Sequence, residues 1–206
     1  MAAEDDFLSG LLELQYGVDV KAKLKKLAKN VSWASYWPEN KVSFWNAEAF
    51  MWNHKISKEK RNIIGHELAA LTGRNLDLGC GSYSYLSSVG FDLSKKMLDF
   101  NDNCYDKIVG DLEQPLPFKP KFDSVTAIFV FNYVKNYRQL LNEIFRILKD
   151  QGIFVMVLSS SSVNDWQKQQ EVNELSKNDW IKILSGKFAV KVKEKDNLIF
   201  YRCRKT

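Results

Sequence analysis

The pattern of apolar and polar positions changes near residue 73 and from there predicts strands alternating with helices. Short apolar runs predict strands at Asn75–Leu78, Ser88–Phe91, Lys107–Val109, Ser124–Phe131 and Ile153–Leu158. Apolar runs with little alternation are typical of parallel strands that helices cover on both faces. Strands that alternate with helical segments indicate βαβ units and a parallel sheet.

The clearest helical pattern lies between the fourth and fifth predicted strands. Apolar residues from Tyr137 to Leu148 recur at spacings of three, four, seven, eight and eleven, which places them on one helical face. Gly152 lies beyond the expected carboxyl end of that helix. A later helix is predicted at Asp179–Leu184, with Ser176 or Asn178 as its cap. The last two strands, Phe188–Val192 and Leu198–Arg202, flank Asp196-Asn197, which favours a hairpin.

Residues 1–72 have helical patterns, with a loop around 37–40. We therefore predict an α/β fold with a Rossmann-like doubly wound sheet of five parallel strands and a C-terminal antiparallel hairpin, with helices on both faces. The predicted organisation is an N-terminal helical extension or lid at 1–72 and an α/β domain at 73–206.

Composition narrows the class of protein. The chain has 206 residues, of which 45% are hydrophobic and 27% charged, as in folded globular proteins. The longest apolar runs are far shorter than the roughly 18 residues that cross a bilayer, and the first residues are acidic rather than basic. The three cysteines are too widely spaced to indicate a disulfide framework or a metal site. These features predict a cytoplasmic protein without a metal and without a membrane partner.

A glycine-containing turn follows the first predicted strand, and two acidic residues follow the next two strands. Gly79 and Gly81 would let a ligand approach the backbone closely. Asp92 ends the second strand, where a carboxylate can bind both hydroxyls of a ribose, and Asp111 follows the third. The carboxyl ends of parallel strands are where such sheets bind ligands. Each aspartate alone could be a cap or turn residue, but the ordered set favours a nucleoside-binding site.

The same residues resemble the class I S-adenosylmethionine-dependent methyltransferases, in particular the small enzymes of the ubiquinone-biosynthesis type. The resemblance is carried by Leu76-Asp77-Leu78-Gly79-Cys80-Gly81-Ser82, by Gly90-Phe91-Asp92-Leu93-Ser94 and by Gly110-Asp111-Leu112-Glu113-Gln114-Pro115-Leu116. Phe122-Asp123-Ser124-Val125 and Leu148-Lys149-Asp150-Gln151-Gly152 continue it. It covers about 85 residues by motif. It implies that residues 73–206 bind S-adenosyl-L-methionine and transfer its methyl group to an O, N or C nucleophile.

The resemblance also implies a role for each motif residue. The Gly79 and Gly81 backbone would face the amino-acid part of the cofactor, and Asp77 would support the loop and receive the ammonium group. Asp92 would bind the ribose, and Asp111 the adenine amino group. Three further positions would complete the cofactor site through packing and backbone contacts: Leu93, Leu112 and Ile128.

Two features depart from the family pattern. Tyr83 replaces a third glycine, and only a short segment separates the glycine turn from the second strand, with room for about two helical turns.

A dinucleotide site is a weaker alternative, because Ser84 stands where the dinucleotide-binding pattern has its last glycine. A non-catalytic regulatory subunit with a methyltransferase fold is a further alternative.

The acceptor is less visible in the sequence. Enzymes of this fold that methylate base or amide nitrogens often have prolines after the fourth strand, and Phe131-Asn132-Tyr133-Val134 lacks them. Neither histidine marks a catalytic base. A small-molecule acceptor is favoured over RNA, although basic clusters, including one in 21–29, leave RNA open. The catalytic residues and the oligomeric state stay unassigned.

Aromatic residues concentrate in the predicted extension. Their positions predict two roles: Trp33, Tyr36 and Trp37, near a loop, would form a lid, whereas Trp45 and Trp52 would pack on one helical stripe with their neighbours.

Overall fold

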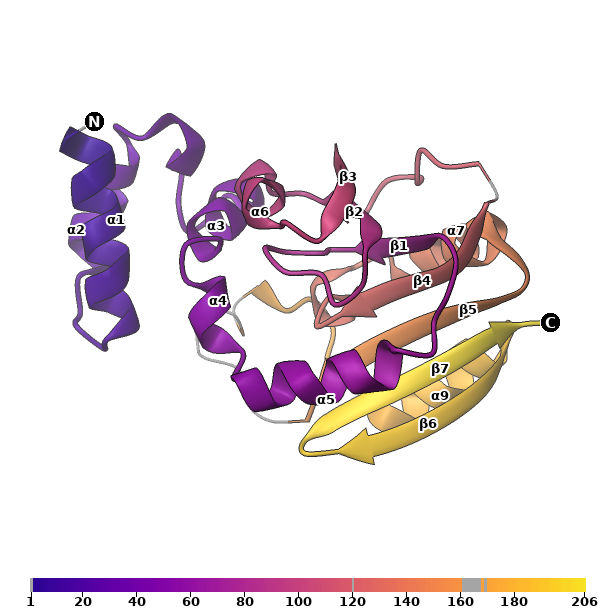
Figure 1. The fold of residues 1–206 in the computed structure, drawn as a ribbon. Coiled ribbons are helices and arrows are strands. Elements are labelled where there is room, and N and C mark those ends of the chain that lie inside the picture. The colour runs from indigo at the N-terminus through magenta and orange to yellow at the C-terminus, as the bar shows by residue number, and fades with distance from the viewer. Residues whose placement is uncertain (1, 120, 161–167, 169) are drawn as a thin grey trace.

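The computed structural model of the chain describes residues 2–119, 121–160, 168 and 170–206. The strands follow one another in the order predicted from the sequence, and helices precede and connect most of them (Figure 1). Their bounds are α1 Ala2–Gln15, α2 Lys21–Ala28, η1 Ser32–Ala34, α3 Lys41–Glu48, α4 Trp52–Lys55, α5 Lys58–Leu68, β1 Asn75–Leu78, β2 Ser88–Asp92, α6 Lys95–Phe100, β3 Cys104–Val109, β4 Phe122–Ile128, η2 Phe131–Tyr133, α7 Tyr137–Ile147, β5 Leu148–Ser159, α9 Lys177–Ser185, β6 Phe188–Lys195 and β7 Leu198–Lys205.

The described strands form one sheet in the order β3-β2-β1-β4-β5-β7-β6. The first five in the chain pair in parallel, and β7 runs antiparallel between β5 and β6, which confirms the predicted fold class. β6 and β7 are joined at Asp196 and Asn197, both with positive φ, as a tight hairpin turn requires. The chain moves outward from β1 through β2 to β3 and then returns to the other side of β1 with β4. That reversal creates a crevice at the carboxyl ends of β1 and β4.

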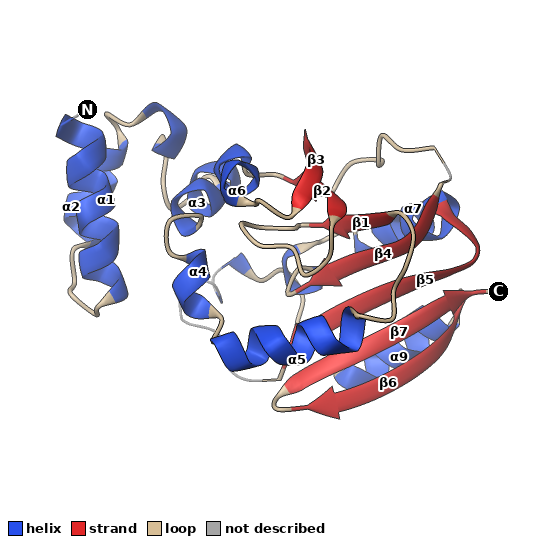
Figure 2. Cartoon of the chain, in the orientation of Figure 1, coloured by secondary structure: helices blue, strands red, loops and turns tan. Residues whose placement is uncertain are grey.

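Helices cover both faces of the sheet (Figure 2), and the side chains of β5 pack alternately against the helices of the two faces. Phe154 and Met156 of β5 point into the core shared with α7 and α9, where the predicted stripe of α7 is buried. Val155 and Val157 point to the opposite face, where they pack with α5. Successive strand residues face opposite sides, so one strand contributes to both cores.

The residues before α4 have an apolar core of their own. α1 and α2 lie side by side at one end of the molecule, away from the sheet (Figure 1). Buried side chains from α1, α2, η1, α3 and the segments that flank η1 and α3 form one cluster: Phe7, Leu11, Leu24, Ala28, Val31, Ala34, Trp37, Phe44, Ala47 and Met51. α5 instead packs on the sheet. Within the described residues, no helix combines the length and apolar composition that a bilayer crossing requires.

Three local predictions were wrong. α7 ends at Ile147 and β5 begins at Leu148, because Leu148 already has an extended backbone, so Gly152 lies within β5 and not just beyond the helix. β4 ends at Ile128 rather than Phe131, because Phe129 adopts a positive φ and the chain turns into η2. The glycine turn after β1 leads into turns and bends rather than a helix. Only nine residues separate Leu78 from Ser88, and a cooperative helix needs more chain than this connection leaves.

Candidate functional site

A cleft lies at the carboxyl ends of the central strands, with about 590 Å³ of empty space that is partly open to solvent. Seven of the eight residues predicted from the sequence line it: Gly79, Gly81, Asp92, Leu93, Asp111, Leu112 and Ile128. The eighth, Asp77, lies beneath the glycine turn and lines a smaller adjoining cavity together with Tyr83 and Tyr85.

The glycine turn is held by its backbone conformation and by a buried amide. Gly79 and Gly81 have φ of 60° and 57°, a region that side chains other than glycine rarely adopt. A Cβ on Gly79 would lie 2.6 Å from the Val130 side chain. The Asn101 side chain donates to the carbonyls of Cys80 and Gly81 and accepts from the Ser84 amide. Asn101 thus fixes the turn in the place where a helix was expected.

The Asp92 carboxylate is buried at the end of β2. It accepts hydrogen bonds from the backbone amides of Gly81 at 2.9 Å and Ser94 at 2.8 Å. Burial raises the pKa of Asp92 to about 6, although these amide hydrogen bonds oppose the shift. Asp92 therefore joins the glycine turn to the start of α6 and also lines the cleft.

The Asp77 carboxyl is buried at the end of β1 and has two hydroxyl partners. Ser84 Oγ donates to it at 2.6 Å and Thr126 Oγ1 at 2.8 Å. Burial raises the pKa of Asp77 to about 7, against the opposing effect of these hydrogen bonds. A carboxyl group with such a pKa can change its protonation state near neutral pH when a cation approaches it.

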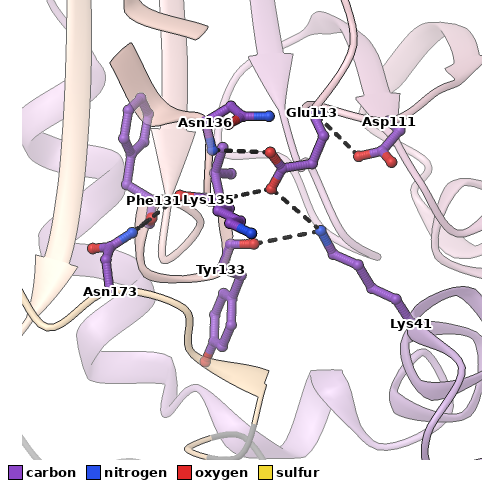
Figure 3. A network of polar contacts seen from close by, with 9 residues as sticks. Lys41, Asp111, Glu113, Phe131, Tyr133, Lys135, Asn136 and Asn173 are labelled. Carbon is purple, nitrogen blue, oxygen red and sulfur yellow. Dashed lines mark hydrogen bonds and ion pairs between the residues drawn. The ribbon is translucent and has the colours of Figure 1, made fainter. Parts of the chain in front are cut away.

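Asp111 and Glu113 follow β3 and organise the far end of the cleft (Figure 3). The Asp111 carboxylate accepts from the Glu113 amide at 3.0 Å. The Glu113 carboxylate in turn accepts from the amides of Lys135 at 2.6 Å and Asn136 at 2.9 Å, just before α7. These bonds tie the segment after β3 to the segment after β4.

The wall opposite the sequence motifs comes from α3, α4 and η2. Lys41, Trp45, Trp52 and Tyr133 all line the cleft. The Trp45 ring packs edge-to-face against Tyr133 at 4.9 Å and against Trp52 at 6.2 Å between ring centroids. The Trp52 indole nitrogen lies 3.3 Å from the position that a Cβ on Gly81 would take. Trp52, at one end of a chain of three aromatic rings, therefore faces the glycine turn.

These positions reverse the roles predicted for the four N-terminal tryptophans, whereas Tyr36, also predicted as a lid residue, is 80% exposed. Trp33 and Trp37 pack in the helical cluster around Phe7, whereas Trp45 and Trp52 line the cleft. The amphipathic spacing of Trp45 and Trp52 indicates only that they share one side of their helices. Whether that side meets a core or a cleft depends on tertiary packing.

The sequence analysis did not identify the residues that hold the aromatic wall, formed by Trp45, Trp52 and Tyr133, in place. Asn173 Nδ2 donates to the carbonyls of Phe131 at 2.9 Å and Val134 at 3.0 Å, which fixes η2 (Figure 3). Asn46 of α3 accepts from Ser94 Oγ at 2.8 Å and donates to the Trp33 carbonyl at 3.1 Å. No local pattern marks either asparagine, because their partners are far away in the sequence.

The groups that line the cleft match the hydrogen-bonding groups of a nucleoside ligand that carries a charged amino-acid part. Glycine backbone at the turn leaves room that a Cβ would fill, and Asp92 and Asp111 follow it along the cleft. Asp77 offers a buried carboxyl at the other end, in the adjoining cavity. These hydrogen-bond acceptors therefore fit S-adenosylmethionine, which offers an ammonium group, ribose hydroxyls and an adenine amino group as donors.

Comparison with known proteins gives the same class. Residues 76–156 match a family described as the methyltransferase domain. An uncharacterized protein of Methanocaldococcus jannaschii is 36% identical over 92 residues, which cover 41% of this chain and 36% of that protein. The match thus spans about a third of the length of that curated relative.

Solved structures agree on the fold. The DhpI–SAH complex superposes with a TM-score of 0.64 at 14% identity, over 80% of this chain and 94% of that one. A putative methyltransferase in complex with the Trm112 methyltransferase activator of Haloferax volcanii gives 0.61 at 18% identity, over 78% and 97%. The chain therefore carries a methyltransferase domain with the fold of the class I S-adenosylmethionine-dependent methyltransferases.

Proposed function

We propose that this chain binds S-adenosyl-L-methionine in the cleft and transfers its methyl group to a small-molecule acceptor. The observation that carries the proposal is the gathering of Gly79, Gly81, Asp92 and Asp111, from three successive strand ends, around one cleft. A structural role for each aspartate alone would not require them to line the same space. The proposal includes the cytoplasmic location predicted from the sequence and the division into an extension at 1–72 and a catalytic domain at 73–206.

The proposal gives each cofactor residue the role that the family resemblance implies. Asp77 receives the ammonium group directly or through water, and the Gly79 and Gly81 backbone borders the amino-acid part. Asp92 binds the ribose hydroxyls. Asp111 accepts from the adenine amino group. Three further residues pack against the cofactor or contribute backbone to it: Leu93, Leu112 and Ile128.

The bound cofactor supplies an electrophilic methyl group on a sulfonium sulfur. The protein then needs chiefly to hold an acceptor nucleophile in line with that methyl group and to limit access of water. The aromatic wall of Trp45, Trp52 and Tyr133 is suited to this task, because large rigid rings give contact area with few rotatable bonds. No residue is assigned as a general base, since alignment alone can suffice for a reactive nucleophile.

A small molecule is favoured over RNA because several surface lysines are paired with carboxylates. Several lysines that could form an RNA-binding face have carboxylate partners: Lys193 pairs with Glu67, Lys177 with Glu194 and Lys25 with Glu39. RNA affinity depends on several cations that neutralise phosphates together. The fold neighbour in complex with the Trm112 activator suggests a second candidate, in which a protein partner controls this domain.

The test is a transfer assay with cofactor labelled in its methyl group. The purified chain is incubated with a cell extract that is then fractionated into RNA, protein and small molecules. We expect label in the small-molecule fraction, and no label with the Asp92→Ala variant. Label confined to nuclease-sensitive material would refute the small-molecule acceptor. No transfer by a chain that binds S-adenosylhomocysteine would favour the regulatory alternative.

A further inference from the structure

The cleft contains a cation that the cofactor motifs do not account for. Lys41 begins α3, and Trp45 lies one helical turn later on the same face, so both side chains line the cleft. Among the described residues that line the cleft, Lys41 carries the one positive side chain, beside two aspartates. Both aspartates lie in the part of the cleft proposed to hold the cofactor. The charged side chain on the opposite wall of the cleft is therefore that of Lys41.

Among the residues that the structure describes, the Lys41 ammonium group has long contacts to Glu113 and Tyr133 (Figure 3). Its Nζ lies 3.8 Å from the nearest Glu113 oxygen and 3.4 Å from the Tyr133 carbonyl oxygen. Glu113 already accepts two backbone amides at shorter distances, so its negative charge is shared. An ammonium group has three donors and forms stronger hydrogen bonds, about 2.7–2.9 Å long, with a carboxylate. A negatively charged group in the cleft would therefore give Lys41 a better partner.

The other side chains of this wall favour a flat or apolar ligand body. Trp45, Trp52 and Tyr133 present ring surface, and Asn173 fixes the η2 backbone that carries Tyr133. A cationic acceptor is disfavoured, because the carboxylates near Tyr133 are engaged outside the cleft. Glu48 pairs with Lys55, and Glu171 accepts from Asn132.

We infer that Lys41, together with Trp45 and Tyr133, selects the acceptor, and that the acceptor is a small molecule with a flat or apolar body and a negatively charged group. Lys41 binds the charged group directly and is a specificity-determining residue. The inference rests on the proposed function, because it assigns to the acceptor the part of the cleft that the cofactor leaves open. It requires no change in the residues that hold the cofactor.

The experiment compares two probes of nearly the same shape. Naphthalene-2-carboxylate and its neutral amide, 2-naphthamide, are titrated by calorimetry into the full chain saturated with S-adenosylhomocysteine. We expect the carboxylate to bind at least about tenfold more tightly, as the loss of a charge-assisted hydrogen bond predicts. Lys41→Gln removes this preference, and Lys41→Arg retains most of it. Lys25→Gln, which removes an exposed lysine in α2, leaves the preference unchanged.

The outcomes separate this inference from the proposed function. If S-adenosylhomocysteine does not bind, the proposed function fails, and this inference fails with it. If S-adenosylhomocysteine binds but the two probes bind equally to the parent chain, only the inference fails. A preference that persists in Lys41→Gln also overturns it. An RNA oligonucleotide that displaces the carboxylate and loses affinity in Lys41→Gln would assign the site to RNA instead.

Discussion

The two walls of the cleft are built in different ways. The wall at 77–112 presents backbone and short carboxylates at strand ends, and its geometry follows from the sheet. The wall at 41–52 and 131–134 presents long side chains from helices whose packing depends on a second apolar cluster. The first wall suits a ligand shared by many enzymes, whereas the second can change with the acceptor. The comparison indicates that the two walls can be perturbed separately.

The largest effect is expected for Gly79→Ala in the first wall. The positive φ and the 2.6 Å approach to Val130 should lower the free energy of unfolding by about 1–3 kcal/mol. Cofactor affinity should fall with it, because the turn must shift. The measurement is chemical denaturation together with S-adenosylhomocysteine titration. In the control Gly65→Ala, where α5 has open space, stability should instead rise by about 0.5–1 kcal/mol. Equal effects of the two substitutions would contradict the strained turn.

The second prediction concerns how Asp77 makes stability and cofactor affinity depend on pH. Because burial raises its pKa to about 7, the folded chain holds the proton more tightly than the unfolded chain, where an aspartate has a pKa near 3.9. The free energy of unfolding of the unliganded protein should therefore fall as the pH rises from about 4 to 7. A cationic cofactor favours the ionised carboxyl, so affinity should rise over the upper part of this range, by up to about tenfold per pH unit.

The matched variant for this prediction is Asp77→Asn, which cannot ionise. Titrations of S-adenosylmethionine between pH 5.5 and 8 should give a flatter profile for the variant, with the two proteins converging at the acidic end. Burial also raises the pKa of Asp92 to about 6, which leaves a smaller slope in both proteins. Parallel profiles would remove Asp77 from the cofactor site.

A substitution in the second wall is expected to change cofactor affinity least. Asn46→Leu breaks the link from α3 to Ser94 and Trp33 and should lower the free energy of unfolding by about 1–3 kcal/mol. Cofactor affinity should change little, because Ser94 still donates its backbone amide to Asp92. Thermal unfolding measures the loss of stability, and S-adenosylhomocysteine titration measures the affinity. Asn30→Leu, at an exposed position, is the control. A collapse of affinity would show that the walls are coupled.

The first wall could be predicted from the sequence because its residues follow strands whose order the chain itself fixes. β1 has the bounds that the apolar run predicts, and the glycines and aspartates follow at fixed offsets. The connection after Gly81 was mispredicted, because the Asn101 side chain supplies the hydrogen bonds that a helix would otherwise make.

The second wall could not be predicted because its geometry depends on contacts between distant segments. Lys41 approaches Glu113 across more than seventy residues, and Asn173 reaches back to Phe131. The spacing of Trp45 and Trp52 indicates one face but not its partner. The helical cluster that buries Trp37, and against which Trp33 packs, likewise depends on contacts across residues 7–51.

The central claim, that the first wall binds S-adenosylmethionine, is tested most directly by calorimetric titration of S-adenosylhomocysteine into the full chain and two variants. The unmodified chain should bind one equivalent. Asp92→Ala should bind at least about tenfold more weakly, because it loses charge-assisted hydrogen bonds to the ribose worth roughly 1.5–3 kcal/mol. Asp99→Ala, which loses only an exposed pair with Lys95, should bind like the parent. No binding by the parent, or equal affinity in a folded Asp92→Ala variant, would contradict the claim.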